Sequence, residues 1–313
     1  MKNIFRILIV CIFQLCIAGN SSLAGSEAQI VSGPMLGYVE HREALIWLEV
    51  QNAKEVTIKY KAVDSPKQNN YLTKTVSLQK PQESSPLKIV LPFLEPNTEY
   101  EYQIFLDKQK HQTNYPDSIK TSFKTKIDCG LEFCLEDFSF LLGSCAFLRD
   151  ERQLTGWDEG NNIGDQTIFS NMAKEDARFM LWLGDALYLR ASDYSSESGI
   201  KQRYTFRRSE KHLQPFLASM SHYAIWDDHD YGPNNNNSSF TLRETSSQIF
   251  QDYWGNKSFG QNQGGIYSKF NYSDAEFFLL DNRFFRDDTE LEASSVEDKS
   301  TLGKEQLQWL KNA

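Results

Sequence analysis

Side chains able to bind a metal follow three apolar segments between residues 138 and 226. Cys145 comes directly after "FSFLLGS", Asp185 and Tyr188 follow "RFMLWLG", and the acidic string Asp227–Asp230 follows "HYAIW". Each apolar run has the length of a strand, and the carboxyl ends of parallel strands share one edge of an α/β sheet. Carboxylates gathered at one place repel one another unless a cation compensates their charge. The pattern therefore predicts a metal site at that edge.

The donor atoms fall into two chemical sets. The thiolate of Cys145 and the phenolate of Tyr188 suit a highly charged transition metal. Asp228 and Asn234 offer only hard oxygen ligands, which suit calcium. Asp185, on the predicted central strand, is best placed to bridge two cations. His229 is the natural general acid for a leaving oxygen, and Asn234 is a second candidate catalytic residue.

The string "WDDHDYGPN" resembles motifs of the calcineurin-like metallophosphoesterases, and within them of the PhoD-like alkaline phosphatases. The usual Gly-Asn-His-acid motif of that superfamily stands here as Asp227–Asp230, and its Gly-Asp motif as Gly184-Asp185. Cys145 replaces an Asp-x-His pair of most relatives, and Tyr188 replaces another Asp. The segments "GPMLGYVEHREALIWLEV", "LLDNRFFRDD" and "LGKEQLQWL" also resemble this family, so the likeness covers nearly all of the mature chain.

The resemblance implies a cofactor cluster of ferric iron, Fe(3+), and calcium, Ca(2+), held by Cys145, Asp185, Tyr188, Asp228 and Asn234. It implies hydrolysis of phosphate mono- or diesters by attack of a metal-bound hydroxide, with His229 as general acid. The substrates would be phosphate-ester small molecules, lipids or polymers. Two alternatives stay open. One is a dedicated phosphodiesterase for lipid or cell-wall esters, because specificity lies in loops around the cleft. The other is an inactive member that binds through its β-sandwich.

The order of elements predicts two domains. Residues 28–127 contain short strand-like runs separated by Pro- and Asn-rich turns, typical of a fibronectin type III-like β-sandwich. Within it, "LEPNTEYEYQI" resembles a tyrosine corner, in which Tyr100 bonds back to the backbone, and Trp47 is the predicted core tryptophan. In residues 137–313 strands alternate with helices, which predicts an α/β metallophosphoesterase sandwich domain. The chain stops within the helical pattern "LGKEQLQWLKNA", so we expect this domain to be incomplete and the 313-residue chain itself to be inactive.

Charged residues outside the motifs leave alternatives open. Arg203, Arg207 and Arg208 lie in a predicted helix, where one could donate to a substrate phosphate or all could form a solvated face. Asp281 and Arg283 end a later strand, and a structural ion pair is the favoured interpretation. The net charge of −9 disfavours binding to nucleic acid through bulk charge, so a phosphate ester would need local attraction.

Residues 1–24 have the pattern of a secretory signal peptide. Lys2 and Arg6 precede an apolar run from Ile7 to Ile17, and Ser22-Leu23-Ala24 supplies a small-residue cleavage site. The run is too short to span a bilayer comfortably, so we expect a secreted or periplasmic protein without a stable membrane span after cleavage. An uncleaved anchor is the alternative.

Export would place the remaining cysteines in an oxidising compartment. Cys129 and Cys134, in "CGLEFC", could then form a small disulfide. This pairing leaves Cys145 unpaired, either as the metal ligand or as an inert buried thiol.

Overall fold

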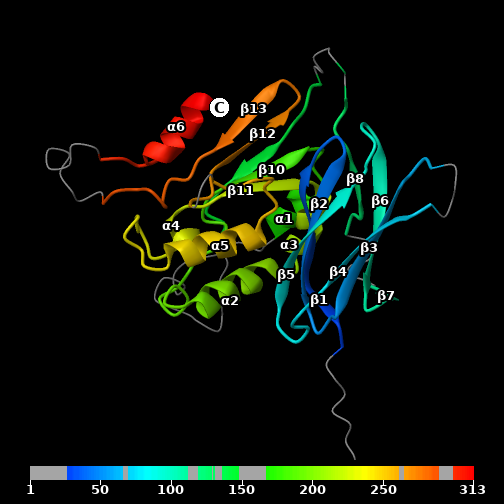
Figure 1. The fold of residues 1–313 in the computed structure, drawn as a ribbon, viewed down its shortest axis with the longest axis horizontal. Coiled ribbons are helices and arrows are strands. Elements are labelled where there is room, and N and C mark those ends of the chain that lie inside the picture. Colours follow the sequence, from blue (N-terminus) through cyan, green and yellow to red (C-terminus); the bar gives the residue numbers. More distant parts are fainter. Residues whose placement is uncertain are drawn as a thin grey trace, which may run out of the picture.

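A computed structural model describes residues 27–65, 70–111, 119–128, 130, 136–147, 167–260, 264–288 and 299–313. The predicted signal peptide and the predicted disulfide partners Cys129 and Cys134 lie outside the described residues. Figure 1 shows a β-sandwich on one side of the molecule and an α/β layer on the other. The predicted fold class, a fibronectin type III-like sandwich followed by an α/β part, is confirmed by the element order and the sheets.

The sandwich consists of two antiparallel sheets. One contains β1 (Gln29–Val39), β2 (Glu43–Gln51) and β5 (Ser85–Pro92), in the order β1-β2-β5. The other contains β3 (Glu55–Ala62), β4 (Leu72–Ser77), β6 (Glu99–Leu106), β7 (Gln109–Lys110) and β8 (Ser122–Lys124), in the order β4-β3-β6-β7 with β8 beside β6. Successive side chains of a strand point to opposite faces, so the apolar set Val56, Ile58 and Tyr60 is buried between the sheets. The tyrosine corner is confirmed, because the backbone N–H of Glu95 donates to the Tyr100 hydroxyl at 2.8 Å.

The α/β part is built on a parallel three-stranded sheet. Its strands are β9 (Leu141–Gly143), β10 (Phe179–Leu183) and β11 (Ser221–Ile225), in the order β11-β10-β9. The helices are α1 (Thr167–Met172), α2 (Glu197–Arg208), α3 (Leu213–Ser219), α4 (Asp228–Tyr231), α5 (Arg243–Tyr253) and α6 (Lys304–Asn312). A hairpin of β12 (Ser268–Tyr272) and β13 (Ala275–Leu279) covers one end of the sheet through aromatic contacts with Phe179.

The two parts share one hydrophobic core. Met35, Tyr38, Leu45 and Trp47 of the sandwich belong to the same cluster of buried side chains as residues of β10, β11, α3 and α5. The strand β2 is buried on both faces, because one face packs inside the sandwich and the other packs on the α/β part. Trp47 is therefore buried as predicted, but its place is corrected. It lies between the two parts, and its Nε1 donates to the carbonyl of Asp252 at 2.8 Å.

Polar contacts join the two parts as closely as the apolar core does. Glu49 of β2 is fully buried, and its Oε1 accepts hydrogen bonds from Ser84, Thr205 and Tyr253 at 2.7, 2.6 and 2.9 Å. A buried carboxylate needs such donors, and two of the three come from the α/β part. The backbones also touch, because the N–H of Tyr38 donates to the carbonyl of Gly255 at 3.0 Å. The sandwich and the α/β part are thus packed together through buried apolar, polar and backbone contacts.

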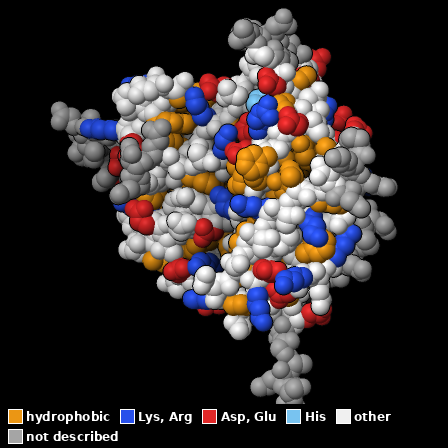
Figure 2. All heavy atoms as spheres, turned by 45° about the vertical axis from the view of Figure 1, so that its right-hand side comes forward, with side chains coloured by type: hydrophobic (Ala, Val, Ile, Leu, Met, Phe, Trp, Pro, Cys, Tyr) orange, Lys and Arg blue, Asp and Glu red, His pale blue; other side chains and the backbone are white. Residues whose placement is uncertain are grey.

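The surface shows mixed charge. On the face displayed in Figure 2, basic and acidic side chains of the described residues alternate without an extended area of one sign. None of the helices in the described ranges combines the length and the hydrophobicity needed to cross a membrane.

Candidate metal centre

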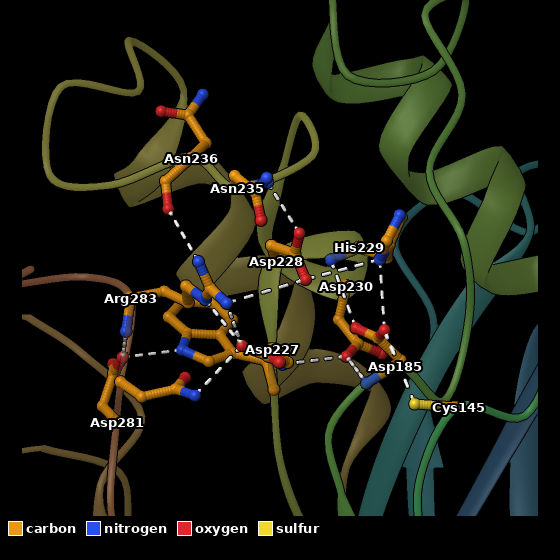
Figure 3. A network of polar contacts seen from close by, with 12 residues as sticks. Cys145, Asp185, Asp227, Asp228, His229, Asp230, Asn235, Asn236, Asp281 and Arg283 are labelled. Carbon is orange, nitrogen blue, oxygen red and sulfur yellow. Dashed lines mark hydrogen bonds and ion pairs between the residues drawn. The ribbon is translucent and has the colours of Figure 1, made fainter. Parts of the chain in front are cut away.

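The structure brings the predicted ligands of three segments to one edge of the parallel sheet. Cys145 follows β9, Asp185 follows β10, and Asp228 and His229 follow β11. Ligand atoms of Asp185, Asp228 and His229 all lie within 4.8 Å of one another, and the Sγ of Cys145 lies 3.9 Å from Oδ2 of Asp185 (Figure 3). Asp185 lies two residues after the end of the central strand, which is the position from which a carboxylate can reach both neighbours.

The turn after β10 is shaped to present Asp185. Gly184 and Asp185 both have a positive φ, of 95° and 53°. A side chain at Gly184 would also place its Cβ 2.6 Å from the Cβ of Asp227, so only glycine fits there. Aspartate tolerates the left-handed conformation better than most residues. The turn therefore carries the carboxylate out of the strand and toward the neighbouring loop.

Asp230 anchors both ligand loops. Its fully buried carboxylate accepts the backbone N–H groups of Asp185, of Leu187 at 3.1 Å and of Asp227 at 3.1 Å. Burial raises the pKa of Asp230 to about 7, and the nearby charge of Asp185 acts in the same direction. Sequence reasoning included Asp230 in the motif but missed this role. The available signal was the spacing from Asp227, which is that of a capping box.

His229 lies between the two candidate carboxylate ligands. Its Nδ1 is 3.1 Å from Oδ2 of Asp185 and 3.4 Å from Oδ1 of Asp228, and these contacts raise the pKa of His229 to about 10. Burial alone would raise the pKa of Asp228. Hydrogen bonds from His229 and from the backbone of Asn235, at 2.6 Å, instead hold that pKa well below its usual range. The acidic cluster thus needs positive charge, which is what a bound cation would supply.

Tyr188 and Asn234 differ in how close they come to this cluster. The ring of Tyr188 lies 4.4 Å from that of His229, and burial together with the charges of Asp185 and Cys145 raises its pKa. Asn234 is exposed, and it is the backbone of its neighbour Asn235 that contacts Asp228. The ligand roles of Tyr188 and Asn234, and the catalytic role of Asn234, stay predictions.

The three arginines of α2 are buried, so a solvated helical face is wrong. Arg203 donates to the buried carboxylate of Asp193 at 2.8 Å. Arg207 donates from Nε to the carbonyl of Ala186 at 3.0 Å and so supports the turn that carries Asp185. Arg208 stacks on Trp254, with its guanidinium carbon 3.7 Å from a ring centroid. These contacts fix α2 beside the candidate metal centre and the sandwich.

The ion pair predicted for Asp281 and Arg283 is also corrected. The guanidinium of Arg283 pairs with Asp227 instead, at 2.6 Å. The carboxylate of Asp281 is buried and accepts the backbone N–H of Arg283 at 2.9 Å and Nε1 of Trp226 at 2.7 Å. The partner differs because the chain folds the loop after β13 against the start of α4.

Comparison with known proteins identifies the family. The family model described as PhoD-like phosphatase matches residues 144–313, which is more than half of the chain. The chain belongs to the PhoD-like phosphatase family. The match begins directly after β9 and includes every predicted ligand. A second model, described as a domain of unknown function (DUF7800), matches residues 27–124.

One solved structure shares the fold over most of this chain. Described as "Structure of PhoD", it is 21% identical with a TM-score of 0.67, and the match covers 89% of this chain and 58% of that one. The chain therefore spans 58% of the length of that relative. The fn3 domain of the human collagen alpha-1(XX) chain (15% identity, TM-score 0.24) matches over 36% of this chain and 97% of that domain. The sensor domain of the anti-sigma factor RsgI4 of Pseudobacteroides cellulosolvens (13%, TM-score 0.27) matches over 35% and 100%. No curated protein sequence matches the chain.

Proposed function

We propose that this protein is a metal-dependent phosphoesterase that hydrolyses phosphate mono- or diesters outside the cytoplasm. The observation that carries the proposal is the convergence of Asp185, Asp228 and His229 at the carboxyl ends of adjacent strands. Carboxylates this close together repel one another, and a bound cation would compensate their charge. Membership of a phosphatase family gives the same reaction class.

The donor set supports the proposed cofactors, ferric iron and calcium. Cys145, Tyr188 and Asp185 would hold the iron, and Asp185, Asp228 and Asn234 would hold calcium. When bound, the cations would activate a water molecule and neutralise the phosphoryl oxygens. Both ligand carboxylates are held in place, because the backbone N–H of Asp185 donates to Asp230 and the carboxylate of Asp228 accepts the backbone N–H of Asn235.

His229 is proposed as the general acid. Its Nδ1 faces the carboxylates of Asp185 and Asp228, which favour the protonated ring. Nε2, on the opposite side of the imidazole, is then the atom that can give a proton to the leaving oxygen. The side chain is 23% exposed, so a substrate in solution can reach it.

The remaining proposals concern export and domain limits. Residues 1–24 are proposed to direct secretion, with residues 28–127 and 137–313 as the two domains. The N-terminal residue of the exported protein checks the first point. A chain beginning near Gly25 is expected, and one beginning at Met1 would reject cleavage.

The activity is tested with the protein expressed from its full reading frame. Asp185→Asn and Asp228→Asn should each reduce hydrolysis of an aryl phosphodiester at least about 100-fold, because the cations supply several kcal/mol of charge stabilisation. Both variants should also carry less metal by elemental analysis. The matched control is Asp274→Asn, an exposed aspartate in the turn between β12 and β13. Full activity in either ligand variant would reject the site.

A further inference from the structure

Arg283 connects two segments that are far apart in the sequence. Its Nε and Nη2 both contact Oδ1 of Asp227 at 2.6 Å, and Nη1 donates to the carbonyl of Asn236 at 3.3 Å. Asp227 and Asn236 are the two ends of the segment that carries Asp228 and His229. Figure 3 shows the guanidinium spanning this segment from the side opposite to Cys145. One residue thus holds both ends of a ligand loop.

The junction is reinforced by a second, reversed contact. Trp226, directly before Asp227, donates from Nε1 to Asp281, two residues before Arg283, at 2.7 Å. Asn282 also donates to Oδ1 of Asp227, at 3.0 Å. The loop after β13 and the start of α4 are therefore joined in both directions, with Asp281 fully buried. Such paired contacts leave the entry to α4 little freedom.

The contacts of Arg283 indicate that it does not bind substrate. Its side chain is 11% exposed, and its fork is directed to Asp227 and Asn236. Oδ1 of the candidate ligand Asp228 lies 3.7 Å from Nη2. That distance is too long for a hydrogen bond but short enough to favour the ionised carboxylate. Arg283 can thus act on the metal site only through the placement and the charge of this loop.

The backbone conformation at Asp227 does not require an aspartate, so the residue type there is explained by the contacts of its side chain. Its φ of −126° and ψ of −160° are open to any amino acid. A carboxylate there adds negative charge beside Asp228, which is unfavourable unless it is compensated. The three donors on Oδ1 from Arg283 and Asn282 supply that compensation.

We propose that Arg283 is a positioning residue of the metal site, which acts through Asp227 to fix Asp228 and His229. The proposal rests on the proposed function, since it assumes that Asp228 is a ligand. Outer-shell partners of metal ligands orient the donor atoms before the cation arrives. A loop that is free to move would present Asp228 to the cation only part of the time.

The test measures calcium affinity by titration calorimetry, well below the unfolding temperature, with Ca2+ alone as the probe. Arg283→Gln should weaken binding by about 10-fold or more, the usual effect of losing an outer-shell partner. Arg283→Lys should have a calcium affinity between those of Arg283→Gln and the wild type, because one ammonium cannot reach both Asp227 and Asn236. Arg178→Gln is the matched control, since Arg178 makes a half-exposed pair with Glu136 away from the site.

A double-variant cycle tests the route through Asp227. Asp227→Ala should lower affinity as Arg283→Gln does, partly because the freed guanidinium can then pair with Asp228. The double variant should bind calcium no more weakly than the single variant with the lower affinity does. If the two losses of calcium affinity multiply in the double variant, Arg283 does not act through Asp227. Wild-type calcium affinity in Arg283→Gln would overturn the positioning role of Arg283. Normal calcium binding with lost hydrolysis in Arg283→Gln would also overturn it, in favour of a substrate contact.

The proposed function is judged separately, by hydrolysis of an aryl phosphodiester by the wild-type protein. Calcium binding without hydrolysis would reject the phosphoesterase proposal and leave the result for Arg283 standing. Absence of calcium binding in the wild-type protein would reject both.

Discussion

The shared core predicts that the sandwich and the α/β part unfold together, and Gly255 is the place to test it. A Cβ added at Gly255 would lie 2.5 Å from the Cα of Gly37 in β1. Backbone cannot give way as a flexible side chain can, so Gly255→Ala must separate the two surfaces. The change would also strain the hydrogen bond from the Tyr38 N–H to the Gly255 carbonyl.

The magnitude follows from three contributions. Overpacking a tight contact destabilises by about 1–3 kcal/mol, and a lost backbone hydrogen bond adds about 1 kcal/mol. Replacing glycine by alanine returns about 0.4–1 kcal/mol by restricting the unfolded chain. We therefore expect Gly255→Ala to lower the free energy of unfolding by about 1–3 kcal/mol. The melting temperature should fall by roughly 3–8 °C.

Urea unfolding followed by tryptophan fluorescence and by far-ultraviolet circular dichroism provides the assay. Coincident curves, shifted together in Gly255→Ala, would show one cooperative unit. The control is Gly143→Ala in β9, where a new Cβ would meet only the flexible end of Met180 at 3.4 Å. It should unfold like the wild type. Two separate transitions, of which only one moves, would refute the reasoning, and so would an unshifted Gly255→Ala.

Three further predictions concern titration and catalysis. Burial lowers the pKa of His222 from 6.5 to about 3. Between about pH 6.5 and pH 3, His222 is therefore protonated in the unfolded chain but neutral in the folded one. The free energy of unfolding has the full contribution of His222 above about pH 6.5 and falls by up to about 1.4 kcal/mol per pH unit toward pH 3. His222→Gln should lose that part of the slope in urea titrations from pH 4.5 to 7 and the exposed control His41→Gln should keep it, whereas parallel curves for all three proteins would contradict the assignment. His229→Ala should slow esters with poor leaving groups most in steady-state assays, and equal losses for an activated aryl ester would indicate a positioning role instead. The protein with its native metals should absorb visible light through thiolate and phenolate charge transfer to iron, and Tyr188→Phe should shift or bleach the band; calcium chelation should remove activity and keep the colour, and a colourless active enzyme holding only zinc would reject the ligand assignment.

Much of the site was predictable because its positions follow local sequence rules. Apolar runs of strand length, each ending in a polar residue, place Cys145, Asp185 and Asp228 at strand ends. The parallel order of those strands then brings the side chains together. The tyrosine corner at Tyr100 was predictable for the same reason, since the residues that form it are only five positions apart.

Contacts between distant segments were decided by the tertiary structure alone. Nothing near Arg283 in the sequence says that its partner is Asp227, 56 positions earlier, rather than Asp281. The burial of Arg208 and the place of Trp47 likewise depend on the sandwich docking against α2 and α5. Local patterns report which face of an element is apolar, because side-chain period follows backbone geometry. They do not report which other surface covers that face, since this depends on how the whole chain closes its core.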